Sequence, residues 1–276
     1  MAEPSRSGCF TQFVMFLAAI LGMYMAAFHT SSSTSVPPTE ITTTVVLAPV
    51  GNFTADELNQ AAAVIQKRLN GLDLSAASVE TADASIRLGL PQVENQDDVL
   101  KTLVARGLLE FVDFSDVSDI GMWNGRDILT TGQGDHPISA TAEKNPVTNK
   151  PFETVLTGDG VKSATSTLSQ QFGDQWQVAV EFSDEAGKVL GDYTRTHLGK
   201  ALAIVLDGKV LSVPIIQAEI STQAVITGNF TEQDTKRLAV QLGSGALPFE
   251  MQARAISILR GDYGISVSTA TPTTSP

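Results

Sequence analysis

The spacing of hydrophobic and polar positions predicts a folded region between residues 41 and 264 that begins with alternating strands and helices. Residues 41–50 are rich in β-branched side chains, which are typical of a strand. Residues 55–69 repeat apolar side chains at helical spacing, which indicates an amphipathic helix. The βαββαβ order of this region predicts a ferredoxin-like unit, in which two helices cover one face of a four-stranded antiparallel sheet. Its predicted elements are strands at 41–50, 75–82, 85–91 and 107–114, and helices at 55–69 and 95–106.

A second α+β unit is predicted after residues 115–154, where Gly, Asp, Asn and Pro are scattered without periodicity. A stretch of this length is either a functional loop or a connection between units, and we interpret it as a connection. Asp207 and Gly208 separate two apolar runs, a pattern that favours a hairpin with a type I′ turn. The predicted elements of this unit are strands at 176–182 and 222–228, the hairpin at 201–215, and helices at 184–198 and 231–242.

The tetrapeptide Gly-Asn-Phe-Thr occurs twice, at residues 51–54 and 228–231. Each copy follows a predicted strand and precedes a predicted helix. Thr54 with Glu57, and Thr231 with Asp234, have the spacing of helix capping boxes. A phosphate-binding loop would need a glycine pattern or a following lysine that neither copy has. The repeat therefore predicts structural helix caps rather than a ligand loop.

The N-terminal region contains an uncharged apolar run at residues 10–28. At about 1.5 Å per residue a helix of this length reaches roughly 28 Å, close to the thickness of a bilayer core. With Arg6 on its N-terminal side, the positive-inside rule predicts a cytoplasmic N-terminus and an extracytoplasmic bulk. The alternative is a cleaved signal peptide, but the run is long for one and lacks a clear cleavage site. We expect a single-pass membrane anchor.

Composition narrows the classes of function. The formal net charge of −12 argues against nucleic-acid binding, which needs clustered Lys and Arg. Cys9 is the only cysteine, so no internal disulfide or thiolate metal site can form. The three histidines, His29, His136 and His197, lie far apart, and we predict no metal and no cofactor. Because no nucleophile, acid–base pair or phosphate-binding motif stands out, we also predict that the protein is not an enzyme.

Four residues are candidates for contact with a partner. Trp123 lies in a polar stretch, where an indole ring is a possible exposed contact. Asp207, Gly208 and Lys209 form the tip of the predicted hairpin. No catalytic residue is predicted.

Residues 202–248, from "LAIVLDGKVLSVP" to "QLGSGALP", strongly resemble the first extracytoplasmic domain of the SecD family of Sec-translocase accessory subunits. The resemblance extends to the segments at 155–164, 178–190, 61–80 and 106–111. It implies a protein of the bacterial plasma membrane, with a base next to the membrane and a head inserted on it. In the family, the head is thought to grip an emerging preprotein and to swing relative to the base.

The sequence also departs from the family. The Gly-Leu-Asp-Leu-Arg-Gly-Gly signature is replaced by "TTTVVLAPVGNF" at residues 42–53, and a Ser/Thr-rich tail follows the head. We therefore expect a truncated, single-anchor form that does not itself conduct protons, because such conduction needs ionisable residues within the membrane. The expected organisation is a cytoplasmic tip and anchor at 1–29, a Ser/Thr/Pro linker at 30–40, the base at 41–114, an irregular connection at 115–154, the head at 155–248, a return strand to the base at 249–264 and a disordered tail at 265–276.

Two hypotheses of function follow from these features. The first is a non-enzymatic, membrane-anchored module that binds unfolded exported polypeptide or Sec translocon subunits, with the edge strands of a sheet as a generic binding mechanism. The second is a stand-alone envelope sensor or assembly protein that uses the same fold without a role in secretion.

Overall fold

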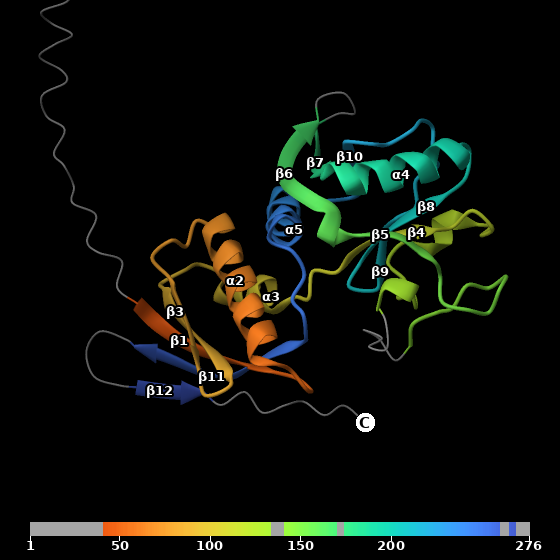
Figure 1. Ribbon diagram of the computed structural model, residues 1–276. Coiled ribbons are helices and arrows are strands. Elements are labelled where there is room, and N and C mark those ends of the chain that lie inside the picture. The colour runs from red at the N-terminus through yellow and green to blue at the C-terminus, as the bar shows by residue number, and fades with distance from the viewer. Residues whose placement is uncertain (1–40, 134–140, 170–173, 260–264, 269–276) are drawn as a thin grey trace, which may run out of the picture. The chain divides into compact units, whose positions relative to one another are not determined.

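The computed structural model describes residues 41–133, 141–169, 174–259 and 265–268. Within these residues the fold is a mixture of helices and sheets, as the sequence predicted (Figure 1). No helix in this part of the chain is long and apolar enough to cross a membrane. The predicted cytoplasmic tip and anchor at 1–29 and the linker at 30–40 lie outside the described residues.

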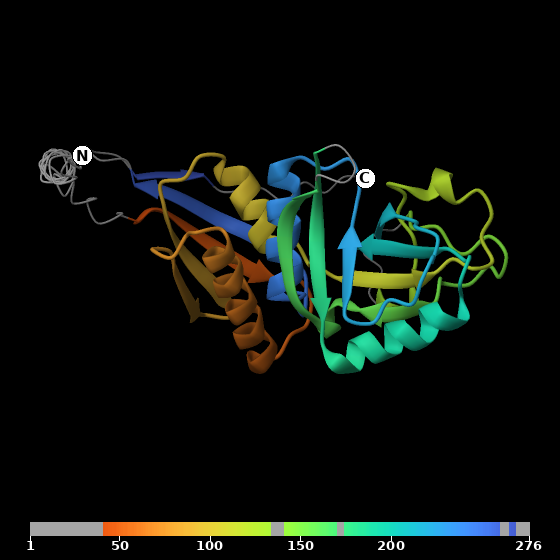
Figure 2. The ribbon, with the colours of Figure 1, turned by 90° about the horizontal axis from the view of Figure 1, so that it is seen from above.

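The first sheet has the strand order β12-β11-β1-β3-β2, and all its neighbouring strands are antiparallel. Helices α2 and α3 pack on this sheet through one apolar core that includes Leu47, Ile65, Leu88 and Leu103 (Figures 1 and 2). We call this unit, residues 41–104 with 249–268, the base. Its elements are β1 (Ile41–Pro49), α2 (Ala55–Gly71), β2 (Ser78–Ala82), β3 (Ser85–Pro91), α3 (Gln96–Val104), β11 (Met251–Leu259) and β12 (Ile265–Ser268).

The fourth strand predicted for the base, residues 107–114, belongs to another sheet. Strand β4 (Leu109–Asp113) pairs with β5 (Thr154–Thr157) and β8 (Leu202–Leu206), while β11 pairs with β1 in the sheet of the base. The prediction was wrong because β4 is buried on both faces, and a continuous apolar run identifies a strand without identifying its sheet. The prediction of a disordered tail at 265–276 is also wrong at its start, because residues 265–268 form strand β12, which pairs with β11.

We call residues 109–244 the head, and their described part contains two sheets. The strand orders are β5-β4-β8-β9 and β10-β7-β6. Helices α4 and α5 share an apolar core with both sheets, including Phe111, Val180, Leu190 and Leu238. In Figure 2, β6, β7 and β10 lie side by side. The remaining elements of the head are β6 (Val161–Ser169), β7 (Gln175–Phe182), α4 (Asp184–Thr196), β9 (Lys209–Ser212), β10 (Gln223–Ile226) and α5 (Glu232–Ser244).

Much of the predicted irregular connection is packed against the four-stranded sheet. It contains the short 3₁₀ helices η1 (Ile120–Trp123) and η2 (Thr131–Gln133), and a third, η3 (Gly158–Gly160), follows β5. Phe114 and Phe152 stack with ring centroids 4.6 Å apart, and Trp123 meets both rings edge-on. This aromatic group covers the face of β4 and β8 opposite the helices, so the connection completes the core of the head.

Both copies of the repeated tetrapeptide begin a helix. The backbone N–H of Thr54 donates to Glu57 over 2.7 Å, and the backbone N–H of Glu57 donates to the Thr54 hydroxyl over 3.2 Å. Thr231 and Asp234 make the same reciprocal pair at the start of α5. The side chains therefore satisfy backbone N–H groups that a helix start leaves without intrahelical partners.

Candidate functional site at the base–head junction

The chain passes between the base and the head twice, through residues 105–108 after α3 and residues 245–248 after α5 (Figure 1). Arg68, on the buried face of α2, lies beside both connections and has 0% of its surface exposed. An arginine carries several N–H donors in a fixed plane, so one side chain can hold several carbonyl groups at once. Arg68 therefore links the two passages of the chain.

The guanidinium of Arg68 donates to carbonyl oxygens from both connections. It bonds to Thr102 over 3.1 Å and Leu103 over 3.0 Å at the end of α3, and it also contacts the Ala105 carbonyl. On the second connection it bonds to the Gly245 carbonyl over 3.1 Å. Further donation to the Arg106 carbonyl and the Ser244 hydroxyl completes the set.

The electrostatics of this site follow from the helix ends around it. Both α3 and α5 end beside Arg68, and the C-terminal end of a helix attracts a cation. Burial lowers the pKa of Arg68 to about 10, while the Asp207 carboxylate opposes this shift. Arg68 therefore stays charged at neutral pH, and its surroundings are carbonyl groups rather than a close carboxylate partner.

The hairpin tip is joined to the first connection. Asp207 accepts a hydrogen bond from the Leu108 backbone over 2.7 Å, and its own backbone N–H donates to the Leu108 carbonyl over 2.9 Å. Burial raises the pKa of Asp207 against the effect of these bonds. Gly107 has φ +73°, and a Cβ there would lie 2.7 Å from an Arg68 nitrogen. The backbone at residue 107 therefore needs glycine both for its conformation and for the space beside Arg68.

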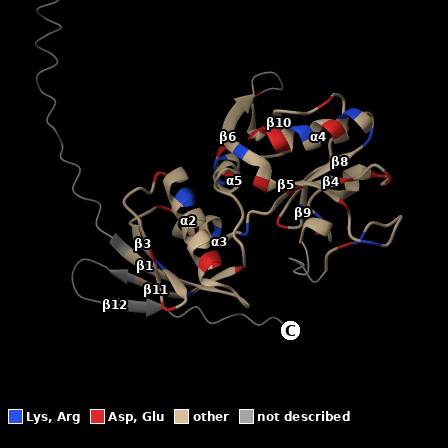
Figure 3. Cartoon of the chain, in the orientation of Figure 1, with Lys and Arg blue, Asp and Glu red and all other residues tan. Residues whose placement is uncertain are grey.

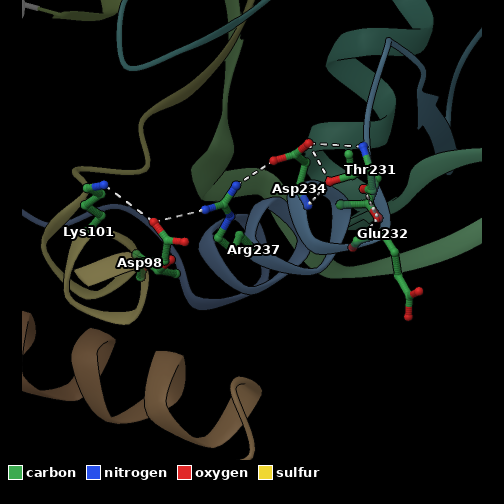
Figure 4. Close-up of polar contacts among 8 residues, drawn as sticks. Asp98, Lys101, Thr231, Glu232, Asp234 and Arg237 are labelled. Carbon is green, nitrogen blue, oxygen red and sulfur yellow. Dashed lines mark hydrogen bonds and ion pairs between the residues drawn. The ribbon is translucent and has the colours of Figure 1, made fainter. Parts of the chain in front are cut away.

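A second polar contact joins α3 to α5 at the surface. Asp98 lies 3.7 Å from Arg237, which also pairs with Asp234 over 2.5 Å (Figure 4). Lys101 approaches Asp98 over 3.5 Å from the same helix. These side chains are partly exposed, so each pair contributes little to stability. The pairs instead fix the positions of the side chains. Asp234 caps α5 and also bonds to Arg237, so Arg237 is held in place toward α3.

A groove of about 370 Å³ lies between α3, α5 and the β8–β9 hairpin. Its apolar side chains are Leu206, Leu211, Phe230 and Leu238. Lys101, Asp234, Arg237 and Gln241 supply polar groups around them. The groove is therefore an apolar surface with a few polar groups at its margin.

The structure separates the residues that the sequence put forward as contacts. Trp123 is only 5% exposed and packs in the aromatic core, so its ring is not available as a surface contact in this conformation. Asp207 is half-buried and bonds to the Leu108 backbone, and Gly208 is buried, while Lys209 is exposed and lies 3.8 Å from Asp127. The hairpin contributes to the groove through Leu206 and Leu211 instead of its tip.

Sequence reasoning missed Arg68 and Arg237. Arg68 follows Ile65 by three positions and precedes Leu69, so it falls on the apolar face of its helix. A cation on an apolar face is a signal of a buried partner. Arg237 carries no comparable signal, because its partner Asp98 is distant in the sequence.

The described residues show no metal-binding cluster of His, Cys, Asp and Glu side chains. Acidic and basic residues are mixed along α4 and α5 instead of forming one basic surface (Figure 3). The features that stand out at the junction are therefore a buried cation, two backbone connections and an apolar groove.

The fold and this junction define a mixed α+β domain in which a head is inserted into a base. Residues 135–249 match the family model of the SecDF P1 head subdomain. The chain is 31% identical over 236 residues to the protein translocase subunit SecDF of Thermus thermophilus, covering 80% of this chain and 30% of that protein. It is 30% identical over 198 residues to the protein translocase subunit SecD of Dictyoglomus turgidum, covering 71% of this chain and 40% of that protein.

Solved structures agree with these matches. One matching structure is of SecDF, described as a membrane component that enhances protein export. It has a TM-score of 0.59 and 29% identity, over 76% of this chain and 97% of that chain. SecDF in a super-membrane-facing form matches with a TM-score of 0.63 and 25% identity, over 90% of this chain and 35% of that chain. The described part of the chain is therefore a periplasmic P1 domain of the SecD and SecDF family. The chain spans between 30% and 40% of the length of the two curated relatives named above.

Proposed function

We propose that this protein is an accessory module of Sec-dependent protein export and that it binds extended polypeptide in the groove at the base–head junction. The observation that carries the proposal is the apolar lining of the groove by Leu211, Phe230 and Leu238 beside the charged Lys101 and Arg237. An unfolded exported chain offers exposed apolar side chains and free backbone groups, which such a surface accommodates without a fixed sequence. The family of the P1 domain supports a role in export.

The proposal includes an arrangement of the anchor, the base and the head across the membrane. The apolar run at residues 10–28 would anchor the protein in the plasma membrane, with the N-terminus in the cytoplasm and the base and head outside. The base would be a ferredoxin-like unit closed by β11, and the head would be the inserted unit. Because the groove has walls from α3 and from α5, movement of the head on the base would change its width.

A purified binding experiment tests the groove. Leu211→Asp in the full chain is expected to weaken binding of a fluorescently labelled unfolded precursor by at least about tenfold, because it places a charge among the apolar side chains. Fluorescence anisotropy gives the dissociation constant. Val189→Asp is the matched control, since Val189 is an exposed apolar residue of α4 that does not line the groove.

The control variant is expected to bind like the parent protein. Equal weakening by Leu211→Asp and Val189→Asp would contradict binding in the groove. Both variants must retain the cooperative unfolding of the parent protein for the comparison to hold.

A further inference from the structure

A buried carboxyl group lies inside the head at the strand that leaves the junction. Glu110, on β4, has 0% of its surface exposed. Its neighbours on the same strand, Leu109 and Phe111, point to the opposite face, so Glu110 faces the described part of the connection, residues 115–133 and 141–154. A carboxylate in such a place is costly unless its oxygens are fully satisfied.

One carboxyl oxygen of Glu110, Oε1, accepts hydrogen bonds from two threonine hydroxyls. The Thr130 hydroxyl lies 2.6 Å from Oε1, and the Thr154 hydroxyl lies 2.7 Å from the same atom. The Thr154 hydroxyl oxygen also accepts from the Gly132 backbone over 2.9 Å, so its single hydrogen is free for Glu110. Oε1 is therefore an acceptor and is not the oxygen that would carry a proton.

The other oxygen lacks a partner. Glu110 Oε2 is buried without a hydrogen-bond partner among the described residues, and so is Oε1 of Gln133. The Gln133 side chain reaches the Glu110 carboxyl, and its amide nitrogen donates to the Ile128 carbonyl over 2.9 Å. Turning the amide over would place its oxygen against that carbonyl. A proton on Oε2 would let this oxygen donate, and the Gln133 side chain that contacts the carboxyl carries an unsatisfied acceptor.

We propose that Glu110 is a proton-binding site of the head, in which the folded protein holds the neutral carboxylic acid and Oε2 donates to Gln133 Oε1. The proton then links β4 to η2, while Thr130 and Thr154 hold the other oxygen. Loss of the proton would leave a buried charge beside the Gln133 side chain. Residues 128–133 would then be held less firmly against the sheet.

The surroundings of Glu110 favour the neutral form. Burial raises the pKa of Glu110 and outweighs the hydrogen bonds from Thr130 and Thr154, the contact with Gln133 and the attraction of Arg106. Arg106 is the one charged group in this set. A Cβ on Gly132 would lie 2.3 Å from Glu110 Oε1, so the backbone of η2 seals the carboxyl on that side.

The proton on Glu110 makes the stability of the folded protein decrease as the pH rises. A folded-state pKa above the ordinary value of 4.5 means that the folded protein holds the proton over a range where the unfolded chain has lost it. The stabilising contribution is complete below the unfolded pKa and is lost as the pH rises toward the folded pKa. Over that window the folding equilibrium constant falls tenfold per pH unit for this one proton.

The experiment compares the full chain with Glu110→Gln by denaturant unfolding at pH values from about 4 to 8. The glutamine amide mimics the neutral acid, since it can accept from the two threonines and donate to Gln133. The ratio of the folding constants, wild type over variant, is expected to fall tenfold per pH unit above pH 4.5 until the folded pKa is reached. A ratio that stays flat or rises with pH would overturn the proposal.

A second measurement does not depend on the variant's folding. Carbon-13 labelling of the glutamate side-chain carboxyl groups allows each to be followed by NMR in the wild-type chain. One carboxyl carbon is expected to keep the chemical shift of the protonated acid at pH values above 4.5. If every glutamate titrates at or below its ordinary pKa, Glu110 is not a proton-binding site.

Discussion

Replacing Arg68 with alanine is expected to lower the free energy of unfolding by about 3–5 kcal/mol. The variant removes a fully buried side chain whose hydrogen bonds hold the ends of α3 and α5 and both connections between base and head. The carbonyl groups of Thr102, Leu103 and Gly245 would be left without these donors, and burial makes each unsatisfied group costly. Equilibrium unfolding in urea measures the change.

Arg87→Ala is the matched control for this prediction. Arg87 is a half-exposed arginine of β3 that pairs with Asp83 over 3.2 Å, and such a surface pair contributes about 0–1 kcal/mol. The comparison therefore separates loss of an arginine from loss of the junction contact. If the free energies of unfolding of Arg68→Ala and Arg87→Ala differ by less than about 1 kcal/mol, Arg68 does not hold the junction together.

Replacing Gly187 with alanine is expected to destabilise the head by about 3 kcal/mol, at the upper end of typical overpacking effects. Gly187 lies on α4, where a Cβ would be 1.9 Å from the backbone oxygen of Ser221. Either the helix or the segment before β10 must move to admit it. Helix propensity acts in the opposite direction, because alanine is favoured over glycine in a helix by about 1 kcal/mol.

Gly191→Ala tests the same substitution one turn later in α4. There a Cβ would lie 3.2 Å from a side-chain oxygen of Glu219, which can rotate away. We expect this variant to be neutral or slightly stabilised, so thermal unfolding should separate the two variants by several degrees. Similar unfolding temperatures would show that α4 does not pack closely on residue 221.

Local signals in the sequence predicted local structure well. The capping pairs of Thr54 with Glu57 and Thr231 with Asp234 depend on residues three positions apart, so spacing alone identifies them. The Asp207-Gly208 turn is similar, since both residues have the positive φ that a type I′ turn requires. The resemblance to SecD and SecDF, and with it the mixed α+β class, is also confirmed.

Contacts between distant parts of the chain could not be predicted in the same way. The apolar run at 107–114 has the composition of any doubly buried strand, and only the pairing with β5 and β8 places it in the head. Trp123 lies in a polar stretch, yet it is buried because Phe114 and Phe152 come from elsewhere to pack around it. The groove has walls from α3, α5 and the β8–β9 hairpin, which meet only in the folded chain.

Site-specific photocrosslinking in cells tests the central claim, that the groove binds polypeptide in transit, most directly. A photoreactive residue at Leu211 lies in the groove, and one at Val189 on α4 serves as the exposed control. We predict that the probe at Leu211 captures many different exported chains and that the probe at Val189 does not. Capture of one discrete envelope protein at Leu211, or equal capture at both positions, would contradict polypeptide binding in the groove.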